Sequence, residues 1–310
     1  MTVTEDFTTT AETVGGPIAV AVIGTGVIGQ DLVSKVHRSP ALDCALVVGR
    51  NPDSAGLDHA HRLGYPTSTG GIDAVLRAER PFDVVFDATN AMSHLEHARL
   101  LRPFTETLLV DLTPSKAGRM VVPTVTGTGA PAGGDVSLIS CGGQASVPIA
   151  HALASRFAAD YIEVVSTVAS TIAGRATRLN LDEYVATTQQ ALTTFSGVRD
   201  TKAILNISPA VPPATFRTAV RAIIPGADLA EVRAVVDAAA AEVRAFAPGY
   251  QVIACSVTGD RVVVSVEVAA DSDVLPRYAG NLDIINSAAI LVAEQHAARV
   301  SAARRTGVLR

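Results

Sequence analysis

The chain has 310 residues, 48% of them hydrophobic, and a formal net charge of −5. This length is sufficient for two globular domains, each with its own hydrophobic core. The acidic balance and the lack of a Lys/Arg-rich stretch exclude a typical nucleic-acid binder, and no apolar run approaches the roughly 18 to 20 residues of a membrane span.

The amino terminus and the cysteines indicate the compartment. Residues 1–16 are rich in Thr and acidic side chains and lack the apolar stretch of a signal peptide, so we expect a disordered lead-in. Cys44, Cys141 and Cys255 are too few and too scattered for a disulfide framework or a four-ligand zinc site. We therefore expect a cytoplasmic protein without a metal site.

The first half of the chain alternates strands with helices. Apolar runs begin at Ile18 and cover 42–50, 82–89 and 107–113, with segments of helical spacing between them. This alternation predicts an α/β fold, with a Rossmann-type doubly wound parallel sheet over residues 17–140.

The pattern changes after a loop-like stretch at 123–135. We expect a helix from about 145 to 158, then longer Val- and Ile-rich strands separated by two further helices. This predicts an α+β second domain over residues 141–280 with a mainly antiparallel sheet. Residues 281–310 are predicted to form a helix that packs back on the first domain and completes it.

A glycine-rich turn follows the first strand and opens the first helix. Its six residues are Gly24, Thr25, Gly26, Val27, Ile28 and Gly29. In this context the G-x-G-x-x-G spacing lets backbone amides approach a pyrophosphate, so the turn predicts dinucleotide binding. The second strand ends at Arg50 in place of the acid that usually binds the adenosine ribose. Arg50 is compatible with a 2′-phosphate or with a solvated loop, which leaves both NAD and NADP open.

Cys141 has the surroundings of a nucleophile. It follows a predicted strand and precedes two glycines and a helix, where a thiolate is stabilised and amides are free to bind an oxyanion. Buried packing is the alternative, and it is the better interpretation for Cys44 and Cys255, which lie inside apolar strands. A nicotinamide domain with a nucleophilic cysteine suggests aldehyde oxidation through a thioester.

The acceptor of the acyl group depends on the residues near the cysteine. Phosphorylating dehydrogenases with a glyceraldehyde-3-phosphate dehydrogenase-like two-domain plan pair the cysteine with a downstream histidine. Here no histidine lies between His151 and His296. We expect His151 to pack or cap, and the five histidines before it to face solvent from helices or loops. These five are His37, His59, His61, His94 and His97.

Several ordered motifs resemble those of CoA-acylating acetaldehyde dehydrogenases, which work with 4-hydroxy-2-oxovalerate aldolase in the meta-cleavage catabolism of aromatic hydrocarbons. The resemblance extends from about Val20 to about Ala298. The motifs are VIGTGVIGQDL, VFDATNAMSH, VDLTPSKAG, ISCGGQASVPIAHA, AGRATRLNLDEY, APGYQV and YAGNLDIINSAA.

The resemblance implies a set of site residues. Cys141 is similar to the acyl-thioester cysteine, Asn180 to a residue that orients the acyl group, and Asn281 to a contact near the nicotinamide. A second cofactor-contacting loop is similar to the following residues: Ile172, Ala173, Gly174, Arg175, Ala176, Thr177, Arg178, Leu179 and Asn180. Asn180 is also placed to cap a helix whose first turn carries Asp182 and Glu183.

The resemblance further implies that a short-chain aldehyde, NAD(P) and CoA are substrates, that an aldolase is a partner, and that the enzyme is a homo-oligomer. The chain departs from the family pattern in two places. Arg175-Ala176 replaces Pro-Gly, and Arg217-Thr218 replaces an Arg-Asp pair whose acid is thought to serve the cysteine. Three explanations stay open: the helix amino terminus alone holds the thiolate, Asp182 or Glu183 substitutes, or the acyl substrate differs. A biosynthetic acyl-CoA reductase and a weakly active nucleotide-binding subunit that supports an aldolase are the alternative functions.

Overall fold

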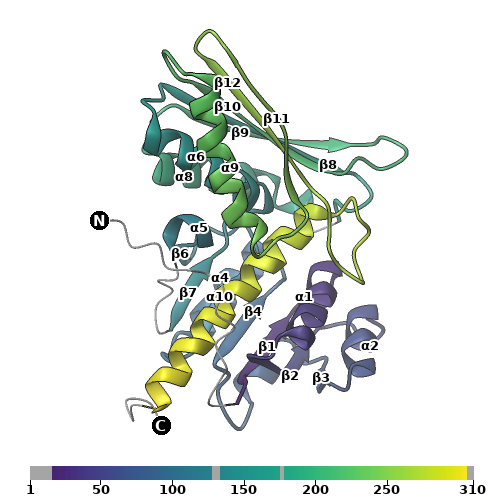
Figure 1. Cartoon of the computed structure of the whole chain (residues 1–310). Helices are drawn as coiled ribbons and strands as arrows, with labels where there is room; N and C mark the ends of the chain where they lie inside the picture. The colour runs from purple at the N-terminus through teal and green to yellow at the C-terminus, as the bar shows by residue number, and fades with distance from the viewer. Residues whose placement is uncertain (1–15, 128–132, 175–177, 306–310) are drawn as a thin grey trace.

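Two β-sheets, flanked by a long carboxyl-terminal helix, organise the molecule (Figure 1). The computed structural model describes residues 16–127, 133–174 and 178–305. The predicted lead-in at 1–16 therefore lies outside the described residues except for its last position. None of the described helices is long and apolar enough to cross a membrane.

The first sheet has seven strands, all of them paired in parallel, in the order β3-β2-β1-β4-β5-β7-β6. Its strands are β1 (Ile18–Ile23), β2 (Leu42–Val48), β3 (Thr67–Ser68), β4 (Val84–Asp87), β5 (Leu108–Asp111), β6 (Arg119–Met120) and β7 (Gly134–Ser137). Central strands such as β1 are almost uniformly apolar because both of their faces are covered. The predicted Rossmann-type sheet is confirmed.

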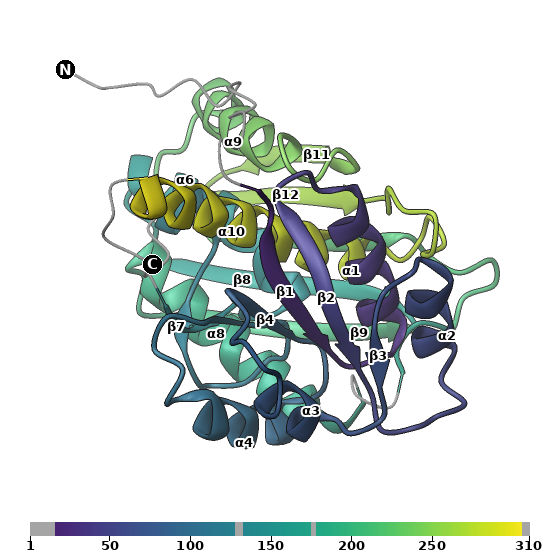
Figure 2. The same cartoon turned by 90° about the horizontal axis from the view of Figure 1, so that it is seen from below.

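Helices cover both faces of this sheet, as Figure 2 shows from below. They are α1 (Val27–Arg38), α2 (Ala55–Arg62), α3 (Ile72–Leu76) and α4 (Ala91–Leu101), whereas the short α5 (Pro123–Thr126) packs against the core of the second half of the molecule. Side chains of α1 and of the long helix α10 (Gly280–Arg305) share one apolar core with the sheet, whereas α3 and α4 pack on the other face. The carboxyl ends of the parallel strands therefore open between two helical layers, where ligands bind in such folds.

The second sheet has five strands in the order β11-β12-β10-β8-β9. Its strands are β8 (Tyr161–Ala169), β9 (Thr201–Ser208), β10 (Phe216–Ile223), β11 (Tyr250–Thr258) and β12 (Arg261–Val268), and its helices are α6 (Cys141–Arg156), α8 (Leu181–Ser196) and α9 (Leu229–Arg244). Only β8 and β9 pair in parallel, so the expected mainly antiparallel sheet is confirmed. Alternate residues of β10 and β12 are buried, because the three helices cover one face of this sheet.

Helix α10 packs against elements of both halves of the molecule, including α1, α6 and β12. Buried polar contacts hold its first turns to α1: Lys35 Nζ lies 2.7 Å from Asp283 Oδ1, and Asn286 Nδ2 donates to Asp31 Oδ2 at 2.7 Å. Apolar side chains of α10 also join the core of the first sheet. Residues 306–310 of the predicted helix lie outside the described residues.

Candidate active site

A sharp turn delivers Cys141 to the start of α6. Ile139, between β7 and α6, has a φ of 57°, a left-handed conformation that costs about 1–3 kcal/mol for a side chain of this kind. Ser140 caps the helix, because its Oγ accepts a hydrogen bond from Gly143 N at 2.9 Å. The helix begins at Cys141, about one turn before the predicted start, so the thiol lies beside the backbone N–H groups of Cys141 and Gly142.

The buried side-chain amide of Gln144 holds this turn in place. Gln144 Nε2 donates to the carbonyl oxygens of Val121 at 2.8 Å and Leu138 at 2.9 Å. Tyr250 Oη donates to Ala145 O at 2.7 Å from the second sheet. Because these partners come from distant segments, the cysteine has a fixed position relative to both sheets.

The thiol opens into a small cavity of about 90 Å³ between the two halves of the chain. Its polar walls include Cys141, Asn180, Tyr184 and Asn281, and most of the remaining lining is apolar. The structure thus brings together three residues that the sequence placed at the site, from α6, the start of α8 and the start of α10. A cavity of this size holds only a few heavy atoms.

Burial controls the state of the thiol. It raises the pKa of Cys141 to about 11, against the opposing effects of the Gly142 N–H, the Asn281 amide and the Tyr184 hydroxyl. Desolvation of the thiolate therefore outweighs the helix amino terminus, whose effect alone would lower the pKa. In this structure Cys141 is a protonated thiol near neutral pH.

Tyr184 is a site residue that the sequence argument missed. It is 7% exposed and its hydroxyl faces the start of α6. A Cβ atom on Gly142 would lie 1.9 Å from Tyr184 Oη, so glycine is required there. The available signal was the helical spacing, because Tyr184 follows Asn180 by one turn on the same face of α8.

The acids proposed as substitutes do not reach the thiol. Asp182 is exposed, Glu183 is half-buried, and neither lines the cavity. No described residue in the lining of this cavity is a His, Asp or Glu. His151 Nδ1 is bound to Phe195 O at 2.7 Å, in the last turn of α8, which agrees with the expected packing or capping role.

A larger cleft of about 610 Å³ lies at the carboxyl ends of β1, β2 and β4. Gly24, Thr25, Gly26 and Arg50 line it. Ala88 and Thr89 line both this cleft and the Cys141 cavity, so a ligand in the cleft can extend to the thiol.

The glycine-rich turn fits a pyrophosphate. Gly24 has a φ of +110° and a Cβ there would lie 2.6 Å from Ala88 O, while a Cβ on Gly29 would lie 2.0 Å from Gly24 O. Gly26 faces open space and is the amino cap of α1, which has no side-chain cap of its own. The first amides of α1 are therefore available to an anion.

The other predicted cofactor residues have more varied positions. Val27 is 48% exposed, whereas Ile28 lines the Cys141 cavity. Within the described part of 172–179 no residue lines either cavity, although Ile172 packs near Ile28, and Arg178 Nε donates to Ala173 O at 3.0 Å. Arg175, Ala176 and Thr177 lie outside the described residues.

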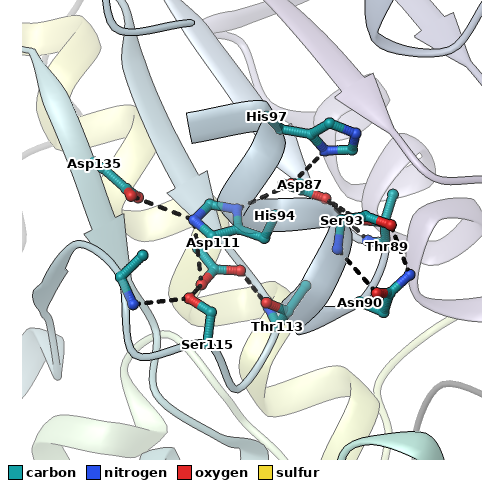
Figure 3. A network of polar contacts seen from close by, with 11 residues as sticks. Asp87, Thr89, Asn90, Ser93, His94, His97, Asp111, Thr113, Ser115 and Asp135 are labelled. Carbon is teal, nitrogen blue, oxygen red and sulfur yellow. Dashed lines mark hydrogen bonds and ion pairs between the residues drawn. The ribbon is translucent and has the colours of Figure 1, made fainter. Parts of the chain in front are cut away.

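A buried group of charged side chains, which we name the His94 cluster, lies at the carboxyl ends of β4 and β5 (Figure 3). It consists of Asp87, His94, His97, Asp111 and Asp135. Asp87 Oδ2 lies 2.9 Å from His94 Nδ1 and 2.8 Å from His97 Nδ1, and Asp135 Oδ2 lies 3.3 Å from His94 Nε2. The expectation that His94 faces solvent is wrong, because its side chain is fully buried against these carboxylates.

The protonation states of the His94 cluster follow from its contacts. Burial opposes the charge on His94, but hydrogen bonds to Asp135 and Asp87 raise its pKa to about 10. Burial also opposes ionisation of Asp87, whose pKa is nevertheless held well below its usual range by His94 and His97. Burial raises the pKa of Asp111 to about 7. Within the described residues no such group has the arrangement of a metal site.

The His94 cluster anchors the walls of the active-site cavity. Thr89 N and Oγ1 donate to Asp87 Oδ1 at 3.1 and 2.5 Å, and Thr113 N donates to Asp111 Oδ1 at 2.7 Å. Thr89 and Thr113 both line the Cys141 cavity. The charged groups therefore hold the loops after β4 and β5 in place without facing the thiol.

The chain is similar to known proteins over most of its length. Residues 141–276 match the family described as prokaryotic acetaldehyde dehydrogenase, dimerisation. An acetaldehyde dehydrogenase of Streptomyces griseus is 67% identical over 289 residues, which is 93% of each chain. The chain belongs to the acetaldehyde dehydrogenase family. Acetaldehyde dehydrogenases of Pectobacterium atrosepticum and Spirochaeta aurantia are 45% and 43% identical over 89% and 91% of this chain and 95% of each relative.

Membership of the acetaldehyde dehydrogenase family confirms the resemblance predicted from the motifs. The protein is an oxidoreductase, and the family in general uses a nicotinamide cofactor, in agreement with the Rossmann-like sheet. The match to a dimerisation region indicates an oligomer.

Proposed function

We propose that this protein oxidises acetaldehyde or another short-chain aldehyde, with NAD(P)⁺ and CoA, to acyl-CoA and NAD(P)H through a thioester on Cys141. The observation that carries the proposal is the position of the thiol. Cys141 lies at a helix amino terminus, in a small cavity that shares Ala88 and Thr89 with the nucleotide cleft. The small, mostly apolar cavity favours a short aldehyde over a bulky one.

The chemistry follows from the site. The Cys141 Sγ, once deprotonated, attacks the aldehyde carbon, and the first amides of α6 are placed to bind the resulting oxyanion. A nicotinamide held by the cleft residues would supply the hydride acceptor for that carbon, and loss of the hydride would leave an acyl thioester on Cys141. The CoA sulfur then attacks the acyl carbon, and Cys141 leaves as the thiolate. In sum, aldehyde, CoA thiol and NAD(P)⁺ give acyl-CoA, NAD(P)H and one proton.

Two amides are suited to orient the reacting groups. Asn180 precedes α8 but makes no capping hydrogen bond with its side chain, so its amide is available to an acyl group. Asn281 Oδ1 is buried without a hydrogen bond among the described residues. We assign Asn180 to the acyl group and Asn281 to the nicotinamide side of the cavity.

We propose that residues 24–29 and Arg50 bind the cofactor, with residues 172–180 as a second segment. The exposed Arg50 lines the cleft next to Asn51, and no acid occupies the end of β2. NAD and NADP are therefore both proposed as cofactors, and titration with each measures the preference.

The larger organisation is also a proposal. We assign residues 17–140 with 281–310 to the nucleotide domain and 141–280 to the catalytic and dimerisation domain, a division supported by the two sheets and by the family match over 141–276. We propose a cytoplasmic homo-oligomer with 4-hydroxy-2-oxovalerate aldolase as partner. Co-purification of the two proteins tests the partner.

The experiment mixes the protein with acetaldehyde, CoA and NAD or NADP and follows both reduced cofactor and acetyl-CoA. We expect CoA-dependent formation of both products, and a loss of at least about 10³-fold in Cys141→Ser, because the alcohol is a poor nucleophile and leaving group here. Cys255→Ser is the matched control and should keep full activity. Reduced cofactor without the corresponding acyl-CoA, for every short aldehyde tried, would contradict the proposal.

A further inference from the structure

The residue at position 218 is the starting point. Where the resemblance led us to expect an acid, Thr218 lies on β10, and it is 1% exposed. Its Oγ1 lies 3.1 Å from the Oγ of Ser166, its register partner on β8. The neighbouring Arg217 is exposed and pairs with Glu267 instead. Position 218 therefore supplies a hydroxyl, and no charge, to the interior.

This pair of hydroxyls continues to the active site. A Cβ on Gly142 would lie 2.6 Å from Ser166 Oγ and 1.9 Å from Tyr184 Oη, so both oxygens converge on the residue after the nucleophile. Tyr184 and Cys141 line the same cavity, and the Tyr184 hydroxyl lies near enough to the thiol to lower its pKa, against the larger effect of burial. Thr218, Ser166, Tyr184 and Cys141 thus form one row, which we name the hydroxyl row.

The hydroxyl of Tyr184 is still free to donate a hydrogen bond. Among the described residues no hydrogen bond of full geometry satisfies its oxygen, although it is completely buried. Burial and the neighbouring Cys141 raise the pKa of Tyr184 well above its ordinary value, so the phenol stays protonated. It is therefore a donor and not a base.

The hydroxyl row also has a preferred direction. No described residue that lines the cavity is charged, so the sulfur is the group in the row that can acquire a charge. When it does, Thr218 donates to Ser166, Ser166 to Tyr184, and Tyr184 to Sγ, because each bond then points its hydrogen towards the anion. Aligned hydrogen bonds polarise one another and strengthen the last one.

We propose that Tyr184, oriented by Ser166 and Thr218, is the hydrogen-bond donor that stabilises the Cys141 thiolate, in place of a general base. Tyr184 is then a catalytic residue, because in this proposal its hydroxyl donates to the reacting sulfur, and Ser166 and Thr218 are positioning residues. The proton of Cys141 passes to solvent, and each hydroxyl keeps its own. This inference rests on the proposed function, in which Cys141 is the nucleophile.

The test measures the thiol directly. The rate at which iodoacetamide alkylates Cys141 is followed between about pH 7 and about pH 12 in the full chain, by mass analysis of the Cys141 peptide. We expect Tyr184→Phe to raise the midpoint by about one pH unit, which is roughly tenfold less thiolate at a given pH below the midpoint, because a hydrogen bond to a charged group is lost. Ser166→Ala and Thr218→Val should lower the thiolate fraction by roughly threefold and twofold.

Two controls separate the proposal from a packing effect. Tyr161→Phe removes a phenol from the same sheet, where Tyr161 Oη donates to Glu163 Oε2 at 3.2 Å, and it should leave the midpoint unchanged. The same alkylation after unfolding in urea, where Tyr184 is no longer held beside the sulfur, is the second control and should give equal rates in all variants. An unchanged midpoint in Tyr184→Phe would overturn the proposal, and unchanged midpoints in both Ser166→Ala and Thr218→Val would overturn the role of the row.

The same experiment distinguishes this inference from the proposed function. Alkylation needs no aldehyde, CoA or cofactor. A shifted midpoint together with no acetyl-CoA would leave the hydroxyl row standing and remove the proposed reaction. The reverse result, full CoA-dependent activity with no shift, would remove the hydroxyl row alone.

Discussion

Two buried polar groups border the cavity at Cys141, and they differ in charge. The His94 cluster joins two histidines to three carboxylates behind Thr89 and Thr113. The hydroxyl row contains no ionised group until Cys141 loses its proton. One group holds loops and the other includes the reacting sulfur.

The difference shows how charge is distributed in this active site. A buried carboxylate beside Cys141 would oppose the formation of a thiolate, whereas neutral hydroxyls favour it once they point their hydrogens at the sulfur. In the His94 cluster each buried charge has an opposite charge within a few ångströms, which is the condition for burying it at all. The permanent charges of the His94 cluster thus hold the loops in place, whereas the neutral hydroxyl row stabilises Cys141 when it loses its proton.

Breaking the His94 cluster should have the largest effect on stability. His94→Leu removes the cation and leaves Asp87 and Asp111 buried without it. We expect a loss of about 3–5 kcal/mol in the free energy of unfolding, measured by urea titration at neutral pH. His61→Leu, on the exposed face of α2, should change it by less than about 0.5 kcal/mol.

This effect should also depend on pH. The folded pKa of His94, about 10, is above its unfolded value near 6.5. The stability that His94 contributes is therefore complete below pH 6.5 and is lost as the pH rises towards about 10. Equal destabilisation of His94→Leu at neutral pH and at pH 10 would contradict the charged state assigned to this histidine.

Filling the space beside the nucleophile should break the hydroxyl row. Gly142→Ala places a Cβ atom 1.9 Å from Tyr184 Oη, so the phenol must move away from Cys141. We expect aldehyde oxidation to fall by roughly 30-fold or more and stability by about 2 kcal/mol, by overpacking. Gly16→Ala, which meets no atom within 4 Å, is the control for the substitution itself. Full activity in Gly142→Ala would show that the position of Tyr184 does not matter.

Local signals made one part of this architecture predictable. The glycine-rich turn, the strand and helix alternation and the thiol before a helix each depend on residues close together in the chain, and all three lie where they were expected. The sequence motifs also indicated the family correctly. Even so, the start of α6 was misplaced by about one turn, because two glycines at its first positions weaken the helical pattern.

Contacts between distant segments were not predictable from one sequence. Ser166 and Thr218 meet because β8 and β10 pair in a particular register, and Tyr184 reaches them because α8 packs across α6. His94 lies on a helix whose pattern resembles that of a surface helix, so nothing in the sequence marked it as buried. The raised pKa of Cys141 also depends on burial, which becomes known only with the fold.

His94 can be compared with a second buried histidine, for which we expect a smaller effect on the free energy of unfolding. His296, on α10, is fully buried, and neither ring nitrogen has a hydrogen bond of full geometry among the described residues. Burial, followed by the charge of Arg299, lowers its pKa to about 4, against a weaker opposing effect of Asp83. His296 is therefore neutral where His94 is charged.

The sign of the pH dependence is consequently reversed. Because the folded pKa of His296 is below its unfolded value near 6.5, its contribution is complete above pH 6.5 and is lost as the pH falls towards about 4. Between neutral pH and about pH 5 the unmodified protein should lose on the order of 1–2 kcal/mol of unfolding free energy through His296. His296→Leu should not show this part of the loss, and urea titrations at the two pH values measure the difference. If His296→Leu and the unmodified protein lost stability equally on acidification, the pKa of His296 would not be lowered in the fold. The distinction between the two buried histidines would then fail.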